Sequence, residues 1–416
     1  MALWKMFSEH RIASLCPILG ATIRSYDAGM KWRYLAMTSV IGPVACNALL
    51  GTEDPRMREE TDAGVDGSTD AGVDGSTDAG VRGCAHSCLG GACVAGKCQP
   101  VALASEMGGT PNEIVADPGT TGSIFWTRYR LGQVIRQDKA TWQMQTLRTA
   151  EFQTDWAQSI AANETTVFWT SPDLDEPIDD RNNYIGWISR DGTDAGKKPG
   201  RPYGDGWYPW PMALDPQYVY WSNRWTKDIW RMDIATKTPE RLGVIDPDGS
   251  SYAIAISPSA GGYVFWVDGR QVFRMDKNGH NVFRISGALG TGDRNTPPLG
   301  LNGSYLYWIR NDALVREDVN GECPDASECP ETVVKAGFVT DAHNLAFDAT
   351  YVYWTEYSAG RVKRARKDDH ALEPEVLVEG VRTVHGIAVD DLYVYFTQQF
   401  GADNDNQPGS VWRVAK

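Results

Sequence analysis

The sequence contains little histidine and no long stretch of positive charge. Only 6 of its 416 residues are histidine, so a Ser-His-Asp arrangement has few candidates. No H-E-x-x-H motif, no G-x-S-x-G motif and no Gly-rich phosphate loop after a strand is present. The 54 acidic residues outnumber the 40 basic ones, and no Lys/Arg-rich run offsets the net charge of -14. The composition therefore argues against a nucleic-acid partner and against the common catalytic motifs.

The apolar run near the N-terminus is short. It covers 34–45, and these 12 residues are too few to span a bilayer as a helix. Because it follows the basic start Met30-Lys31-Trp32-Arg33, we expect residues 30–46 to be a signal peptide. The preceding residues 1–29 carry several charges and fit no targeting pattern, so we expect translation to start at Met30.

The end of the predicted signal peptide, Pro43-Val44-Ala45-Cys46, resembles a bacterial lipobox. It predicts an acyl anchor on Cys46 and an exported protein, either an outer-membrane lipoprotein or a periplasmic or extracellular one. Cleavage without a lipid is the alternative, since Leu is usual where Pro43 stands. Residues 47–83 contain the octad TDAGVDGS twice, at 61–68 and 69–76, and have almost no apolar bulk. They predict a flexible tether.

Six of the 8 cysteines lie downstream of this tether, and we expect them to form disulfides, which implies an oxidising compartment. Four fall in the Gly-rich segment 84–100, which is too small to have its own core, and two bracket one loop. A zinc site is the alternative for the first four, although paired C-x2-C spacings are absent. The pairing within that segment stays open. The six are Cys84, Cys88, Cys93, Cys98, Cys323 and Cys329.

The 16 Trp, 17 Tyr and 42 Gly are typical of aromatic-rich short strands joined by tight turns. One aromatic strand recurs seven times, at steps of 42 to 52 residues, and a small apolar strand precedes each copy. A period of this length with four short strands per unit predicts an all-β, seven-bladed β-propeller over 101–416. The copies are Ile124-Phe125-Trp126, Val167-Phe168-Trp169, Val219-Tyr220-Trp221, Val264-Phe265-Trp266, Leu306-Tyr307-Trp308, Val352-Tyr353-Trp354 and Val394-Tyr395-Phe396.

The chain ends after the third strand of the seventh repeat, and residues 101–104 supply a candidate fourth strand. We therefore expect the N-terminal strand to close the ring beside the C-terminal one. A third strand ending in arginine follows each aromatic strand, and we expect these arginines to make structural pairs and the tryptophans to form the core between blades. The arginines are Arg136, Arg190, Arg231, Arg274, Arg316, Arg364 and Arg413.

The signal, the Asp/Gly-rich tether, the segment CAHSCLGGACVAGKCQPV and the aromatic repeats together resemble exported seven-bladed propeller (lipo)proteins of the myxobacterial type. Tyr353-Trp354-Thr355-Glu356 is also distantly similar to the Tyr-Trp-Thr-Asp repeat of LDL-receptor-type propellers, and TolB-like propellers are a further resemblance. The resemblance implies a fold and an exported location, and almost no chemistry.

The loops that enter the first strands of a propeller open on one face, around the central channel. The residue before each first strand is expected to lie at this channel mouth, and histidines, aromatics and amides there suit ligand recognition. Ordinary loop residues with satisfied side chains are the alternative. The positions are Asn112, Gln158, Trp210, Tyr252, Pro297, His343 and His385, with Trp207 and Tyr208 from a neighbouring loop.

Two long acidic loops, 172–183 and 398–409, are expected on the same face. Acidic loops beside aromatics suit sugar or peptide ligands, with Ca²⁺ as an optional cofactor, whereas solvated loop charge is the simpler interpretation. The candidate carboxylates are Asp173, Asp175, Asp179, Asp403 and Asp405.

The sequence thus predicts a non-enzymatic, monomeric binding propeller without a required cofactor. Its expected ligand is a protein, peptide or glycan, and it would contact a membrane only through the lipid anchor. A lyase or hydrolase with His343 and His385 at the channel mouth is one alternative, since some seven-bladed propellers place a histidine base there. A structural envelope scaffold is another.

Overall fold

The chain divides into Met1–Gly75 and Ser76–Lys416, a division that falls within the predicted tether, and every described residue lies in the second unit. The computed structural model describes residues 84, 88–149, 156–172, 183–199, 209–223, 226–244, 251–259, 261–268, 271–286, 298–320, 330–400 and 408–416. The predicted signal peptide, Cys46, Cys323 and Cys329 lie outside these residues.

The aromatic runs form strands because aromatic and β-branched residues suit a pleated, buried surface. In β25 (Tyr351–Glu356) every residue after the first is buried. Gly360, at φ +65°, turns the chain back into β26 (Arg361–Arg366), and its amide donates to the Glu356 carbonyl. Such turns repeat along the chain and produce a series of antiparallel four-stranded meanders.

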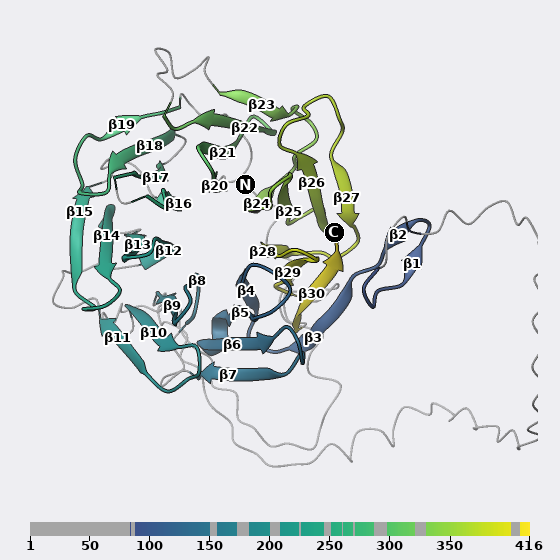
Figure 1. The fold of residues 1–416 in the computed structure, drawn as a ribbon, viewed down its shortest axis with the longest axis horizontal. Helices are drawn as coiled ribbons and strands as arrows, with labels where there is room; N and C mark the ends of the chain where they lie inside the picture. The colour runs from purple at the N-terminus through teal and green to yellow at the C-terminus, as the bar shows by residue number, and fades with distance from the viewer. Residues whose placement is uncertain are drawn as a thin grey trace, which may run out of the picture. The chain divides into compact units, whose positions relative to one another are not determined.

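Within the described residues there are seven four-stranded sheets, arranged as blades around one axis (Figure 1). This confirms the predicted seven-bladed propeller. Blade 1 is β4 (Pro111–Ala116), β5 (Ser123–Arg128), β6 (Gln133–Asp138) and β7 (Met144–Arg148). Blade 2 is β8 (Ile160–Ala162), β9 (Thr166–Ser171), β10 (Tyr184–Ser189) and β11 (Ala195–Pro199). Blade 3 is β12 (Pro209–Leu214), β13 (Tyr218–Asn223), β14 (Asp228–Asp233) and β15 (Pro239–Val244).

Blade 4 is β16 (Ser251–Ile256), β17 (Tyr263–Asp268), β18 (Gln271–Asp276) and β19 (Phe283–Arg284). Blade 5 is β20 (Leu299–Asn302), β21 (Tyr305–Arg310), β22 (Ala313–Asp318) and β23 (Glu331–Val334), and blade 6 continues from β24 (Ala342–Phe347) through β25 and β26 to β27 (Glu375–Val378). A short 3-10 helix, Tyr129–Leu131, lies between β5 and β6.

Blade 7 combines the two ends of the propeller. Its strand order is β28 (Val384–Val389), β29 (Tyr393–Gln398), β30 (Gly409–Ala415) and β3 (Val101–Met107). Val101 pairs with Arg413 and Ala104 with Val411, so the predicted ring closure is confirmed. The register shifts twice along this pair, which bends β3 around the outer edge of the blade.

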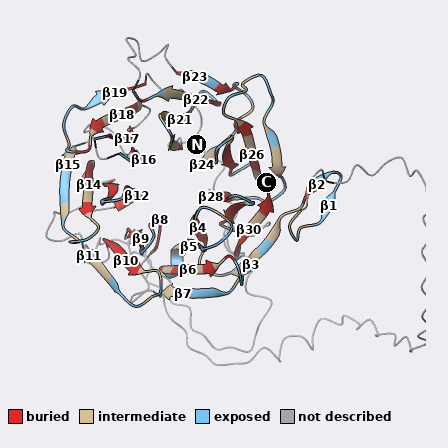
Figure 2. Cartoon of the chain, in the orientation of Figure 1, coloured by how far each residue is buried: buried red, intermediate tan, exposed pale blue. Residues whose placement is uncertain are grey.

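The hydrophobic core lies between the blades, in seven clusters that each join two neighbours. Figure 2 shows buried residues on the inner and middle strands and exposed ones on the outer strands. Each repeat tryptophan is at most 2% exposed, which confirms that these side chains form the core. Burying about 150–250 Å² of aromatic surface contributes about 4–6 kcal/mol of gross hydrophobic free energy per tryptophan.

A second set of contacts joins neighbouring blades through charge. In blade 3, Asp215 directly follows the first strand and accepts hydrogen bonds from Tyr220 and from Lys277 of blade 4, with Lys277 Nζ 2.6 Å from Asp215 Oδ2. Equivalent pairs connect four further interfaces. They are Asp117 with Arg190, Asn302 with Lys367, Asp348 with Lys416, and Asp390 with Lys139.

These pairs correct one sequence assignment. Six of the seven predicted arginines pair with the middle aromatic of their repeat, as Arg136 does with Phe125. In blade 2 the middle aromatic is Phe168, and the residue that pairs with it is Trp187 instead of Arg190. Arg190 instead occupies the position of the lysines and binds Asp117. The predicted structural pairing holds for most of the others. Arg231, Arg316 and Arg364 bind Glu240, Glu331 and Glu375, and Arg136 and Arg274 donate to backbone carbonyls.

The cysteine-rich segment before β3 contains the hairpin β1 (Cys93–Val94) and β2 (Lys97–Cys98). Its disulfides join Cys84 to Cys93 and Cys88 to Cys98, with Cα–Cα distances of 5.9 and 5.1 Å. The structure therefore supports the disulfide interpretation over a zinc site and supplies the pairing that the sequence left open. Cys98 is buried in the cluster that contains Val414 and Ala415, so the segment shares the core of blade 7.

Candidate functional site

Six of the predicted mouth residues lie among the described residues and occupy one structural position, which we call the ring position. In each of these repeats one residue of the first strand pairs with the last aromatic of the second strand, and the ring position lies two residues before it. The six pairs are Ile114–Trp126, Ile160–Trp169, Met212–Trp221, Ile254–Trp266, Leu345–Trp354 and Ile387–Phe396. One detail of the prediction is wrong. Asn112, Trp210, Tyr252, His343 and His385 lie inside the first strands rather than just before them, because these strands begin earlier than their apolar runs.

Hydroxyl groups hold several ring positions to the preceding blade. Thr127 of blade 1 donates to the Gln158 carbonyl, and Thr355 of blade 6 donates to the His385 carbonyl at 2.7 Å. Thr397 of blade 7 donates to the Asn112 carbonyl at 2.5 Å, across the point of ring closure. Each threonine follows the last aromatic of its repeat, and that spacing is the sequence signal for this contact.

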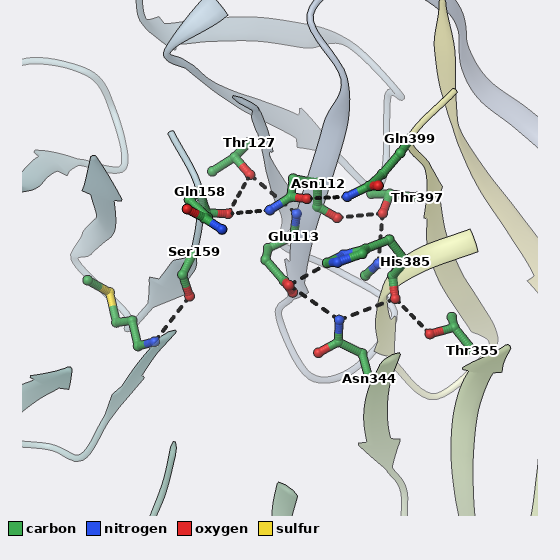
Figure 3. Close-up of polar contacts among 12 residues, drawn as sticks. Asn112, Glu113, Thr127, Gln158, Ser159, Asn344, Thr355, His385, Thr397 and Gln399 are labelled. Atoms are coloured by element: carbon green, nitrogen blue, oxygen red, sulfur yellow. Dashed lines mark hydrogen bonds and ion pairs between the residues drawn. The ribbon is translucent and has the colours of Figure 1, made fainter. Parts of the chain in front are cut away.

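Asn112 and Gln158 belong to this framework more than to a ligand surface. Asn112 is 6% exposed, donates to the Gln158 carbonyl at 2.9 Å and accepts from Gln399 (Figure 3). Gln158 is 4% exposed, and its Oε1 has no hydrogen-bond partner among the described residues. The Asn112 side chain and the Gln158 backbone carbonyl are therefore committed to joining blades 7, 1 and 2, and the Gln158 side chain is buried there.

The two histidines lie together on the inner strands of blades 6 and 7. Their rings meet edge to face with centroids 5.2 Å apart, and His343 stacks on Tyr357 at 4.6 Å. His343 Nε2 lies 3.5 Å from Asp341 Oδ1, and both side chains are partly exposed. The two predicted histidines, which come from adjacent repeats, are thus in direct contact.

Glu113, next to the ring position of blade 1, completes this group and was missed by sequence reasoning. Its Oε1 lies 3.5 Å from His385 Nδ1 and accepts a 3.3 Å hydrogen bond from Asn344 of blade 6 (Figure 3). Blade 7 lies between, but it has Gly386 beside its ring position. A Cβ there would lie 2.6 Å from the Asn112 carbonyl oxygen and 3.0 Å from Glu113 Cα. The missing side chain lets blades 6, 7 and 1 converge.

Burial sets the charge of this group. Burial raises the pKa of Glu113 to about 7, and the Asn344 hydrogen bond opposes the rise only weakly. Burial also lowers the pKa of His385 to about 3, with a further contribution from the nearby His343. Burial would raise the pKa of Asp341, but hydrogen bonds from His343 and Ser358 outweigh it and bring the pKa to about 2. At neutral pH His385 is therefore uncharged and Asp341 is ionised.

The remaining candidates are not brought into this group. Trp210 lies in β12 of blade 3 and Tyr252 in β16 of blade 4, away from the histidine pair around the ring (Figure 1). Trp207, Tyr208, Pro297 and the candidate carboxylates Asp173, Asp175, Asp179, Asp403 and Asp405 lie outside the described residues. The acidic-loop prediction therefore stays a prediction.

Metal ligands are scarce in the part of the chain that the structure describes. One group of three sulfurs, from Cys84, Cys88 and Cys98, lies within 4.8 Å, and all three are committed to disulfides. In the same residues, no helix has the length and apolar character that crossing a bilayer requires.

Comparison with known proteins gives a fold. No family model and no curated protein matches the sequence. A solved β-propeller domain, that of Cps50 (Swd1) from Myceliophteria thermophila, is similar with a TM-score of 0.54 and 12% identity over 76% of this chain and 99% of that one. The structure of YCF48 bound to D1 peptide is similar with a TM-score of 0.54 and 14% identity, over 76% and 94%. The shared feature is the propeller fold. The resemblance to myxobacterial, LDL-receptor-type and TolB-like proteins stays a prediction.

Proposed function

We propose that this protein is a non-enzymatic binding propeller. Its ligand, a protein, peptide or glycan, would bind at the end of the ring at which the inner strands begin. One observation carries the proposal. Asp341, His343, His385 and Glu113 form a polar, partly exposed group where three adjacent inner strands begin, whereas the neighbouring side chains of Asn112 and Thr397 join blades. The function requires no cofactor.

The contacts within the group suit recognition. The imidazoles touch carboxylates, each other and a tyrosine ring, an arrangement that offers hydrogen-bond acceptors and aromatic faces side by side. The similarity to a propeller solved with a bound peptide is compatible with a peptide ligand, although it rests on fold alone.

The proposed location is outside the cytoplasm. The two disulfides support it, because such bonds persist in oxidising compartments. An acylated Cys46 at the end of a signal peptide would then hold the propeller at the outer membrane through residues 47–83. Metabolic labelling with a fatty-acid analogue tests the anchor, and unlabelled, soluble protein would contradict it.

The binding function is tested by thermal unfolding of the full chain against a panel of peptides and glycans. A ligand at 100 times its Kd stabilises the folded state by about 2.7 kcal/mol, which gives a measurable rise in melting temperature. The variant His343→Ala/His385→Ala should lose this rise, whereas His280→Ala, at an exposed turn of blade 4, should keep it. Equal shifts in all three proteins would place the ligand elsewhere.

The same experiment addresses the enzymatic alternative, which the contact between His385 and Glu113 favours, since an imidazole beside a carboxyl is a common acid–base pair. A panel ligand that is consumed by the parent and left intact by the double alanine variant would replace binding with catalysis as the function. Binding without turnover in the parent supports the proposal.

A further inference from the structure

The group formed by blades 6, 7 and 1 has more hydrogen-bond acceptors than donors. Asn344 uses its amide nitrogen twice, toward Glu113 Oε1 and toward the His385 carbonyl, both at 3.3 Å. Its oxygen is turned away from both (Figure 3). His385 Nδ1 has no hydrogen-bond partner among the described residues. His385 Nδ1 lies 3.5 Å from Glu113 Oε1, and the Asn344 amide nitrogen is the side-chain donor that the carboxyl accepts from.

In the part of the chain that the structure describes, no lysine or arginine pairs with that carboxyl. Elsewhere the described acidic residues that are at most 6% exposed pair with a lysine or arginine, as Asp215 does with Lys277 and Glu356 does with Arg361 and Lys363. Within the described residues, the ionisable side chain that contacts Glu113 is His385, which is uncharged at neutral pH. A partly exposed carboxyl without a countercharge favours a ligand that supplies one.

On this basis, and resting on the proposed binding function, we infer that Glu113 and His385 bind a primary ammonium group of the partner. An ammonium offers three hydrogen-bond donors and a positive charge, and two of these donors match the carboxylate oxygen and the imidazole nitrogen. A metal ion fits less well, because the described side chains provide no set of three carboxylate or imidazole ligands here within 4.8 Å of one another.

Titration of Glu113 should make this binding depend on pH. The groups that contact it are His385 from β28 and Asn344 from β24; His343 of β24 contacts His385, and Asp341 contacts His343. Its pKa is raised to about 7, so the ionised form that attracts an ammonium predominates above pH 7. Affinity should therefore be constant at higher pH and fall about tenfold per pH unit below 7.

The test uses the full chain and three peptides. Acetyl-Gly-Gly-Lys-Gly-Gly-amide carries a side-chain ammonium, the norleucine analogue has the same length without charge, and pentaglycine amide has only an N-terminal ammonium. Binding of the lysine peptide but not the norleucine one is the expected result at pH 8. Binding of pentaglycine amide alone would identify the source as a chain terminus, which still supports an ammonium site.

Glu113→Gln keeps the shape of the side chain and removes its charge, so we expect binding at pH 8 to weaken about tenfold or more, with no pH dependence left. Glu317→Gln is the matched control. Burial likewise raises the pKa of Glu317 to about 7, but it lies on β22 of blade 5. His385→Gln, which retains an acceptor, should weaken binding less. Melting curves of each variant separate loss of binding from loss of folding.

The outcomes also separate this inference from the binding function. If an uncharged panel ligand binds and the double histidine variant abolishes it, the binding function stands and the ammonium assignment is wrong. Equal binding of the lysine and norleucine peptides, or an equal loss in Glu113→Gln and Glu317→Gln, overturns the ammonium assignment. If neither charged nor uncharged ligands bind at these residues, both proposals fail.

Discussion

At the scale of single residues, the candidate site depends on a side chain that is missing. Gly386 separates His385 from the apolar part of β28, and the backbone of β4 lies directly against it. Its amide donates to Thr397 Oγ1 at 2.8 Å, and Thr397 in turn donates to the Asn112 carbonyl. The atoms that a larger residue would meet belong to the backbone, so they cannot rotate away.

Gly386→Ala should therefore destabilise the protein by about 1–3 kcal/mol, the usual cost of overpacking, and separate blade 7 from blade 1 at the ring position. Chemical denaturation measures the first effect, and lysine-peptide affinity the second. Gly261→Ala is the control, since a Cβ there meets nothing within 4 Å. Matching midpoints for the two variants would contradict the packing argument.

At the scale of strands and blades, the sequence predicted the fold well because each of the seven repeats contains an aromatic strand that can be recognised within the repeat itself. The aromatic strands are continuous runs, and residues 101–104 were recognisable as the missing fourth strand from the ring's own symmetry. In four blades an arginine of the third strand lies opposite the middle aromatic, and a lysine three residues later binds the neighbouring blade. Arg190 was assigned to the first of these two positions, but in blade 2 Trp187 occupies it. Glu113 could not be found this way, because its partner Asn344 is 231 residues distant.

The interfaces between blades also show a correlated set of residues. Where Asp215, Asp348 or Asp390 directly follows the first strand, a tyrosine of the same repeat donates a hydrogen bond to the aspartate and a lysine of the next blade pairs with it. The interface between blades 4 and 5 instead has Ser257, Phe265 and Val319 at these positions. Ser257 Oγ still accepts from the Tyr263 amide, as Asp215 does from Tyr218. The turn is therefore kept in both versions, and only the charged pair is exchanged for apolar packing.

This exchange predicts a non-additive mutant series. Lys277→Met leaves the Asp215 carboxylate 5% exposed without its cation, which should cost about 3–5 kcal/mol. Burial alone would raise the pKa of Asp215, but hydrogen bonds from Lys277 and from backbone amides outweigh it, so the group is ionised in the parent. The triple variant Lys277→Val/Asp215→Ser/Tyr220→Phe copies the next interface and should recover most of the loss in urea unfolding. A triple variant less stable than the single one would disprove the equivalence of the interfaces.

At the scale of the whole molecule, the ring is closed by hydrogen bonds between strands that are some 300 residues apart in sequence, and the disulfide segment lies at that closure. Tyr393 of blade 7 donates to the Leu89 carbonyl at 3.3 Å, and Cys98 is buried beside Val414. The disulfide segment, which precedes β3 in the chain, therefore packs against blade 7, the blade in which β3 is the fourth strand. Loop closure over about 10 residues restricts the unfolded segment and stabilises its docked form by about 3 kcal/mol per disulfide.

Reduction should therefore loosen the closure before it unfolds the ring. We expect hydrogen exchange of the β30 amides around Val411 and Arg413, which pair with β3, to become faster in the presence of a reducing agent, because local opening needs less free energy than global unfolding. Amides of the β13–β14 pair in blade 3 are the internal control and should keep their protection. Uniform acceleration across both blades would show that the disulfides stabilise the whole ring at once, and no change in either would show that β3 holds the closure without them.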